Sequence, residues 1–379
     1  MVGPLAIDTY LPSFPAIGKS FHVDQLLVQQ TLSVFLFSFA FMMLFYGTLS
    51  DTFGRRPVIL VSLAVYVGAS CGAALAPSFG WLLLFRALQG LAAGGGSVVS
   101  RAIVRDRFSG AEAQGVLAYM MMVFGLAPAI APILGGWLHV TFGWRAVFVF
   151  LCSFGTLMLV TCYRALPESL PPAARHPFHP LAIAANYWKV LRHPRFLLMA
   201  LAIGIAFSGF ALYIGSAAHF VMDILHLPET AFGWMFIPLI SGMMGGSAVA
   251  ARIGLRIAPT RLVAAGYLIM ALAAIVNVGY NHLYQAAVPW AVLPLLLYAF
   301  GLALATPAIT VMLLDIFPHN RGLAASLQSF VQMLMFALVS GLVAPLLFES
   351  AFKLACGVLA ALVLSLLCWA VSRPGAAAA

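Results

Sequence analysis

The stretch Gly47-Thr48-Leu49-Ser50-Asp51-Thr52-Phe53-Gly54-Arg55-Arg56-Pro57 joins two long apolar segments, residues 27–50 and 58–76. Each of these segments is long enough to cross a bilayer as a helix, which takes about 20 residues. The stretch carries the charges of Asp51, Arg55 and Arg56, and Gly54 can turn the chain. We therefore interpret it as a short charged loop between two membrane spans.

The same alternation of apolar segment and short charged loop continues along the chain. Of the 379 residues, 63% are hydrophobic and 8% are charged, whereas soluble domains have about 25% charged residues. This composition excludes a soluble protein, and the length leaves no room for a soluble catalytic domain. The sequence predicts an all-α integral membrane protein of about twelve transmembrane helices. The expected spans are 1–17, 27–50, 58–76, 79–100, 113–138, 144–164, 196–219, 229–251, 261–280, 286–312, 322–347 and 352–372.

The basic residues predict the orientation of these spans. One set of alternate loops, with the C-terminal tail, holds fifteen of the 19 Lys and Arg residues, and the other set holds Lys19, Arg145 and Lys353. Because basic residues concentrate on the cytoplasmic side, we expect the first set and the C-terminus to be cytoplasmic. The first set comprises Arg55, Arg56, Arg101, Arg105, Arg107, Arg164, Arg175, Lys189, Arg192, Arg195, Arg252, Arg256, Arg261, Arg321 and Arg373.

The longest connection lies between the sixth and seventh spans. It is rich in proline and basic residues and includes Trp188 and Lys189, which suit a membrane interface. We expect an N-terminal six-helix half at 1–164, a cytoplasmic linker at 165–195 and a C-terminal six-helix half at 196–379. Two halves in the same orientation are typical of transporters built from parallel repeats.

Two ionisable residues, Asp8 and Arg86, are expected deep inside spans. Such residues are costly in a membrane and are candidates for function. Counting from the predicted membrane exits places them at similar depth, so they could share one cavity, where Asp8 would bind and release a proton. The alternatives are a purely structural Asp8–Arg86 pair, or an Asp8 that caps a helix broken near Pro12. The first span is short, and we expect an upstream start or a truncated form.

The loop at 47–57 is similar to the cytoplasmic loop motif of the major facilitator superfamily, G-x-x-x-D-(R/K)-x-G-R-(R/K). Thr52 stands where that motif usually has a basic residue. The fourth span, with Arg86-Ala87-Leu88-Gln89-Gly90, resembles the family's span-four motif. Gly125, Pro128, Pro132, Gly135 and Gly136 in the fifth span resemble the motif of drug/proton antiporters. The segment Ile7-Asp8-Thr9-Tyr10-Leu11-Pro12 looks like the opening helix of the Bcr/CflA subfamily of bicyclomycin and chloramphenicol resistance transporters.

The resemblance implies proton-driven efflux of small drugs by alternating access. It makes Asp8 the protonatable acid and Arg86 the arginine that couples proton to substrate. It implies a cytoplasmic gate formed by Gly47, Asp51, Gly54, Arg55, Arg56 and Arg105. The residues expected to line the substrate cavity are Asp8, Tyr10, Arg86, Gln89, Phe210 and Tyr213.

Small residues also suggest how helices pack. We expect Gly47 to allow close helix contact. Pro128 and Pro132 should bend the fifth span, whose glycines let a neighbour approach. Gly242, Gly245 and Gly246 offer a matching surface in the eighth span, and we expect these two spans to meet; ordinary packing without a gating role is the alternative.

The sequence leaves functions other than efflux open. An importer or exporter of one metabolite, such as a sugar or an amino acid, is the alternative transporter, and a receptor or scaffold is the alternative class. An intramembrane enzyme would need a cluster of catalytic or ligating side chains, which the sequence does not show, so we expect no enzyme, metal or cofactor. The expected partners are a drug-like molecule, protons and membrane lipid, with no nucleic acid. We expect a monomer in the bacterial cytoplasmic (inner) membrane.

Overall fold

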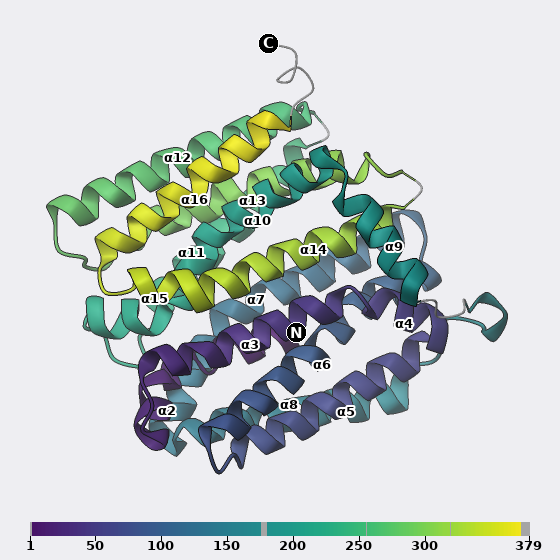
Figure 1. The fold of residues 1–379 in the computed structure, drawn as a ribbon, viewed down its shortest axis with the longest axis horizontal. Coiled ribbons are helices and arrows are strands. Elements are labelled where there is room, and N and C mark those ends of the chain that lie inside the picture. Colours follow the sequence, from purple (N-terminus) through teal and green to yellow (C-terminus); the bar gives the residue numbers. More distant parts are fainter. Residues whose placement is uncertain (1, 176–179, 255, 319, 373–379) are drawn as a thin grey trace. The chain divides into compact units, whose positions relative to one another are not determined.

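A computed structural model describes residues 2–175, 180–254, 256–318 and 320–372. Within these ranges all the regular elements are helices (Figure 1). Eleven of the helices in this part of the chain are long and apolar enough to cross a membrane. The prediction of an all-α membrane protein is therefore confirmed.

The chain forms two compact units, residues 1–180 and 181–379. The boundary at Pro180 falls inside the predicted linker. The linker prediction also includes residues 176–179, and the basic set includes Arg373; these positions lie outside the described residues.

The first unit is built around α6, which packs against α3 and α5, while α5 also packs against α8. The short α1 contacts α6, α7 and α8. The elements are α1 (Val2–Asp8), η1 (Leu11–Ser13), α2 (Phe14–Phe21), α3 (Gln25–Met43), α4 (Tyr46–Phe53), α5 (Arg55–Ala74), α6 (Phe79–Arg107), α7 (Gly110–Phe142), α8 (Trp144–Ala165) and η2 (Pro172–Ala174).

In the second unit, α13 packs against α11 and α12, and α10 packs against α14 and α16. The elements are α9 (Pro180–Leu191), α10 (Pro194–Gly215), η3 (His219–Ile224), α11 (Gly233–Ile253), α12 (Pro259–Leu283), α13 (Leu293–Leu314), α14 (Arg321–Leu338), η4 (Val339–Val343), α15 (Ala344–Leu347) and α16 (Ala351–Val371).

Two expected spans are interrupted. The segment predicted as a first span over residues 1–17 is split into α1, η1 and α2, and the second span is split into α3 and α4. The loop between α4 and α5 is a single residue, Gly54, whose φ of +99° places it in a region that favours glycine. Gly54 therefore allows α5 to start directly at Arg55.

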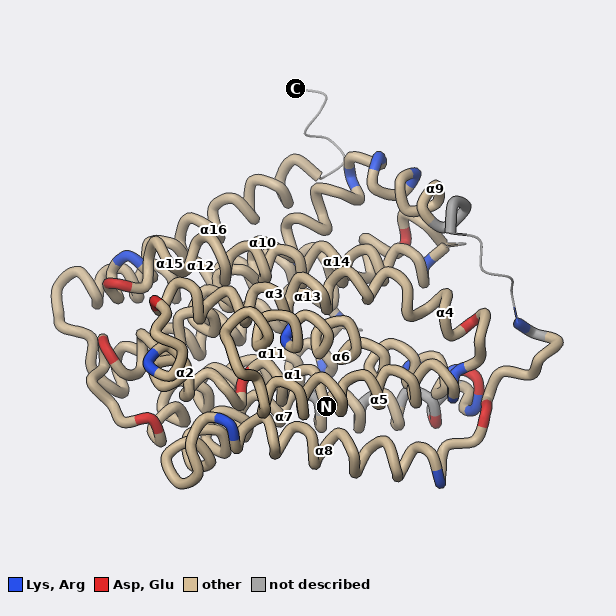
Figure 2. The backbone as a smooth tube through the Cα atoms, turned by 60° about the horizontal axis from the view of Figure 1, so that its bottom comes forward, with Lys and Arg blue, Asp and Glu red and all other residues tan. Residues whose placement is uncertain are grey.

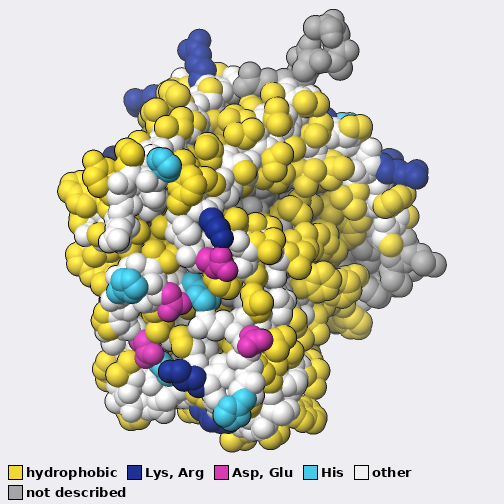
Figure 3. All heavy atoms as spheres, turned by 60° about the vertical axis from the view of Figure 1, so that its left-hand side comes forward, with side chains coloured by type: hydrophobic (Ala, Val, Ile, Leu, Met, Phe, Trp, Pro, Cys, Tyr) yellow, Lys and Arg dark blue, Asp and Glu magenta, His cyan; other side chains and the backbone are white. Residues whose placement is uncertain are grey.

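The surface is dominated by apolar side chains. Large hydrophobic residues on the long helices are exposed, including Leu75, Tyr119, Leu157 and Leu272, and hydrophobic atoms cover much of the face drawn in Figure 3. Charged residues are sparse and mostly occur near helix ends (Figure 2). A helix surface of this kind suits contact with lipid and not with water.

Candidate functional site

The helix α1 is interrupted after Asp8 by a turn at Thr9 and Tyr10, and η1 then leads directly into α2. Pro12 stands in the first turn of η1 and Pro15 in the first turn of α2. Because proline has no backbone N–H, it can open a helix but cannot continue one that comes before it. The break makes Asp8 the last residue of α1, with 3% of its surface exposed.

Arg86 lies in α6 and is fully buried. Its Nη1 donates to the carbonyl oxygen of Ala6 in α1 at 3.1 Å and to Oε1 of Gln89 at 2.9 Å. Its Nε donates to the carbonyl oxygen of Thr31 in α3 at 3.4 Å. One guanidinium thus joins α1, α3 and α6, while its Nη2 is buried without a hydrogen-bond partner.

Two aromatic rings flank this guanidinium. Its central carbon lies 4.1 Å from the ring centre of Tyr10, at the helix break, and 4.3 Å from that of Phe35, in α3. The Tyr10 hydroxyl is in turn 3.1 Å from Oγ1 of Thr31. Desolvated cation–π contacts stabilise a charged arginine by up to about 2 kcal/mol. The two rings therefore stabilise the buried positive charge of Arg86.

Gln89 carries the polar network onward to α5. Its Nε2 donates to Oγ of Ser70 at 2.8 Å, and the Ser70 hydroxyl donates to the carbonyl oxygen of Tyr66 at 2.7 Å. The side chains of Gln89 and Ser70 are buried. The buried polar cluster therefore reaches from the helix break, through Arg86, to a third neighbouring helix.

Asp8 lies close to this cluster without joining it. It is two residues from both Ala6 and Tyr10, which contact Arg86, yet no hydrogen bond or ion pair links Asp8 to Arg86 in the described part of the chain. Its Oδ1 is buried and unpartnered. The direct Asp8–Arg86 pair, which the sequence left open as a structural alternative, is not formed. The structure does bring together Asp8, Tyr10, Arg86 and Gln89.

The other two expected cavity residues belong to the second unit. Phe210 is buried beside Phe207, with ring centres 5.4 Å apart. The Tyr213 hydroxyl accepts a hydrogen bond from Nδ2 of Asn277 in α12 at 3.0 Å. Tyr213 is therefore directed into the interior of its own unit.

The residues of the charged loop meet around Arg55, which is 7% exposed. Its Nη1 donates to the carboxylate of Asp51 and, at 2.7 Å, to Oγ of Ser50. Its Nε donates to Oδ2 of Asp106 at 3.0 Å. Arg55 thus fastens the end of α4 and the end of α6 to the start of α5.

The other arginines of the expected gate behave differently. Arg56 turns to α8, where its Nη2 donates to the carbonyl oxygen of Tyr163 at 2.8 Å. Arg105 is exposed, and within the described residues nothing pairs it with Asp51. The α6 residue of this network is Asp106. Neighbouring residues of a helix point about 100° apart, so only one of the two can face Arg55.

Glu168, which follows α8, is a further residue of this network and was not among the predicted site residues. Its carboxylate accepts hydrogen bonds of 2.9 to 3.2 Å from the backbone N–H groups of Arg55, Arg56, Ser169 and Leu170. Burial acts to raise the pKa of Glu168, but these donors outweigh it and hold the pKa below its usual value. Glu168 thus caps the start of α5.

Close packing at the cap depends on Gly54. A Cβ at Gly54 would lie 2.5 Å from Oε2 of Glu168, so a side chain there would displace the carboxylate.

A signal for Glu168 does exist in the sequence, because it is the only acidic residue between Glu112 and Asp223.

The expectation for Gly47 was wrong. A Cβ at Gly47 would meet no atom within 4 Å, so Gly47 serves no close helix contact. Gly242 and Gly246 are used inside the second unit, where an added Cβ would lie 2.1 and 2.2 Å from carbonyl oxygens of α13. In α11 these glycines therefore pack against α13. The expected meeting of the fifth and eighth spans stays a prediction.

The antiporter-like residues lie in α7, where Pro128 and Pro132 are inside the helix. An added Cβ at Gly135 would lie only 1.7 Å from the carbonyl oxygen of Thr9, whereas one at Gly125 would meet nothing within 4 Å. Gly136 is buried. Gly135 is therefore the position at which α7 packs closely against the backbone of Thr9, which follows Asp8.

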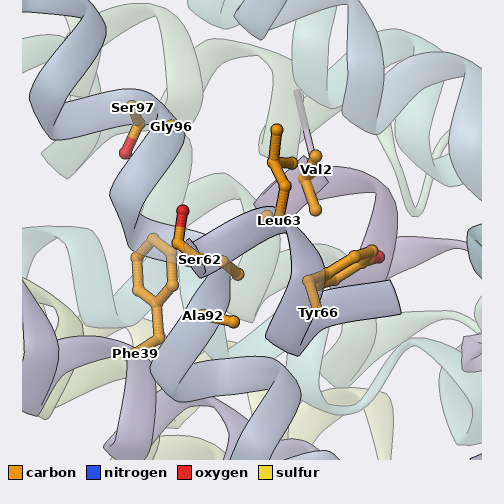
Figure 4. Close-up of a pocket in the computed structure, with 10 residues that line it drawn as sticks. Val2, Phe39, Ser62, Leu63, Tyr66, Ala92, Gly96 and Ser97 are labelled. Carbon is orange, nitrogen blue, oxygen red and sulfur yellow. The ribbon is translucent and has the colours of Figure 1, made fainter. Parts of the chain in front are cut away.

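A small cavity lies in the first unit next to the polar cluster. Its volume is about 30 Å³, enough for about two water molecules. Figure 4 shows Ser62, Leu63 and Tyr66 of α5 and Ala92, Gly96 and Ser97 of α6 around it. A drug-sized ligand needs several hundred Å³, so this cavity suits water and not substrate.

A larger apolar groove of about 450 Å³ runs along α3, α4, α5 and α6. Its lining residues Phe53 and Val61 are more than half exposed. The groove therefore opens to the surroundings of the helices, and it does not contain Asp8 or Arg86. Among the residues described, no group of three or more His, Cys, Asp or Glu side chains is placed to hold a metal ion.

The chain thus has the helices of an integral membrane protein, two compact units and a buried polar cluster in the first unit. Residues 1–340 match the Major Facilitator Superfamily, and the chain belongs to this family. It is therefore a transporter and not an enzyme.

Proteins of similar sequence or structure include drug-resistance and transport proteins. A "Bicyclomycin resistance protein homolog" of Haemophilus influenzae is 33% identical over 66% of this chain. The matched region spans 63% of that protein, which is less than two thirds of its length. A "Multidrug transporter MdfA" of Edwardsiella ictaluri is 27% identical over 87% of this chain and 80% of its own length. The crystal structure of the human organic anion transporter TETRAN shares the fold, with a TM-score of 0.72 and 22% identity, covering 98% of this chain and 96% of that one.

Proposed function

We propose that this transporter exports small drug-like molecules in exchange for protons, with Asp8 as the proton-binding residue. The observation that carries the proposal is the unpartnered Oδ1 of Asp8, buried beside the cluster around Arg86. A buried carboxylate without a partner is costly, and a proton on Asp8 removes that cost. The names of the relatives, a bicyclomycin resistance homolog and multidrug transporters, support drug-like substrates.

The free Nη2 of Arg86 supplies the coupling in this proposal. When Asp8 loses its proton, the carboxylate and this N–H group attract each other, and a new hydrogen bond would rearrange the contacts of Arg86 with Tyr10 and Gln89. Tyr10 and Gln89 would then present different surfaces to a substrate. Proton and substrate binding would thereby exclude each other, so that an inward flow of protons drives substrate outward.

We also propose the membrane arrangement that this mechanism needs. The two halves, 1–164 and 196–379, are joined by the linker at 165–195. Together they open the transport path alternately to the two sides of the membrane. The Arg55 network with Asp51 and Asp106 lies on the cytoplasmic side, as does the C-terminus, and the membrane is the bacterial inner membrane. The network would stabilise one conformation, because its hydrogen bonds hold the ends of α4, α5 and α6 together.

The test is transport by the purified protein in liposomes with an imposed pH difference. We expect Asp8→Asn to abolish proton-driven movement of ethidium or chloramphenicol while substrate binding remains. Asp24→Asn is the matched control, because Asp24 is an exposed carboxylate that precedes α3, and it should transport like the unmodified protein. Proton-driven transport at the normal rate in Asp8→Asn would contradict the role of Asp8. Transport of neither drug by the unmodified protein would contradict drug efflux.

A further inference from the structure

The helix α9 stands directly before a membrane span. It ends at Leu191, and α10, one of the helices able to cross the membrane, begins at Pro194. In Figure 1, α9 runs across the direction of α10 and α14 and not along it. A membrane crossed by α10 would therefore have its lipid headgroups at the level of the last turn of α9.

One side of α9 faces the protein. Val190 is 3% exposed, and the side chain of Tyr187 lies near that of Ser326 in α14. These two residues point to the same side of the helix, because they are three positions apart. This side of α9 therefore faces the protein, and the opposite side faces outward.

The outward side carries an aromatic ring and two basic groups. Trp188 is 58% exposed, Lys189 and Arg192 are exposed, and the Arg192 guanidinium lies over the Trp188 ring at 5.0 Å. Tryptophan and basic side chains together are typical of a membrane interface. The sequence has no acidic residue from position 169 to 222, so no carboxylate of this segment can satisfy the positive charges.

We propose that Trp188, Lys189 and Arg192 form a binding surface for the phosphate headgroups of anionic phospholipids. The two basic groups would contact the phosphate, and the indole ring would lie among the headgroups and the first carbons of the acyl chains. The stacking of Arg192 on Trp188 holds the guanidinium at that level. Each basic side chain at an anionic surface strengthens binding roughly fivefold, so the pair gives this helix a clear preference for anionic over neutral lipid.

The test uses the full chain in nanodiscs of phosphatidylcholine that contain a small fraction of lipid brominated near the headgroup. Bromine quenches nearby tryptophan, and the difference between the unmodified protein and Trp188→Phe isolates the Trp188 signal from the other tryptophans. We expect brominated phosphatidylglycerol to quench Trp188 at roughly 25-fold lower mole fraction than brominated phosphatidylcholine. We expect Lys189→Gln/Arg192→Gln to remove this preference.

The matched control is Arg256→Gln/Arg261→Gln, which removes two exposed basic residues from another loop of the same unit and should keep the preference. Equal quenching by the two lipids, or a preference that survives in Lys189→Gln/Arg192→Gln, would overturn the proposal. Displacement of the lipid by millimolar glycerol 3-phosphate would show a site for soluble phosphate and would equally overturn it.

Discussion

The position of Arg86 shows how a single charge can be held inside an apolar helix bundle. Three acceptors and two aromatic rings surround the guanidinium. A planar group with several fixed N–H donors can serve all of these contacts at once, whereas a lysine ammonium is a compact point charge. The site is therefore built for arginine in particular and not for positive charge in general.

From this geometry we predict that Arg86→Lys reduces transport at least tenfold. The ammonium can replace only part of the contacts, and a hydrogen bond to a charged group contributes about 1.5–3 kcal/mol. Arg101→Lys is the control, because Arg101 is an exposed arginine of the same helix. Initial rates in liposomes at equal protein content measure the effect, and near-normal transport by Arg86→Lys would contradict it.

Glu168 gives a prediction about pH. Its pKa is lowered in the folded protein, so its contribution to stability is complete above the usual carboxylate pKa of about 4.5 and disappears as the pH falls through the lower folded value. We expect Glu168→Gln to lower the free energy of unfolding by about 1 kcal/mol at pH 7. The loss is modest because the carboxylate is partly exposed, which weakens its hydrogen bonds. Thermal unfolding in detergent should show this difference at pH 7 and a smaller one at about pH 4. A difference that grows on acidification would show that the cap does not act through its charge.

The sequence identified Asp8 and Arg86 because charge is rare in this chain, and a charge within an apolar span is conspicuous. It did not identify their surroundings. Phe35 lies 51 positions from Arg86 and Glu168 lies 113 positions from Arg55. Such neighbours are set by helix packing, which periodicity and composition do not reveal. The same reason explains why Asp106 was overlooked in favour of Arg105.

At the scale of the helices, Gly135 of α7 leaves no room for a side chain. We predict that Gly135→Ala damages both folding and transport, because its new methyl group would overlap the carbonyl oxygen of Thr9. Gly115→Ala, in the same helix, has open space around the new methyl group and should be tolerated. The yield of monodisperse protein and its transport rate are the measurements. Equal behaviour of the two variants would mean that α1 and α7 are less closely packed.

The lengths and order of most spans could be predicted from hydrophobicity, but the interruptions could not. The predicted second span at 27–50 is continuous in hydrophobicity, yet the helix stops at Met43 and resumes at Tyr46. The expected span at 286–312 starts only at Leu293, where Pro294 stands in the first helical turn. A hydropathy pattern reports which residues can enter lipid and not whether their backbone stays helical.

For the whole molecule, the distribution of basic residues predicts an orientation that can be measured. In a variant without the five native cysteines, we expect Lys353→Cys to react with a membrane-impermeant maleimide in intact cells. Arg256→Cys should react only after the membrane is opened. Both side chains are exposed, so accessibility of the residue itself does not limit the reaction. The reverse pattern of labelling would contradict the proposed orientation.

The contact between Thr9 and Gly135 links Asp8, the residue proposed to bind the proton, to the helix α7. The two prolines of α7 each remove a backbone hydrogen bond, which makes that helix easier to bend. Because no clearance separates α7 from the peptide after Asp8, bending of α7 must displace that peptide too. Substrate would then be sensed at Asp8 mechanically as well as through charge. Hydrogen exchange should accordingly change together in α1 and the middle of α7 when substrate is added, and a change in one alone would exclude the linkage.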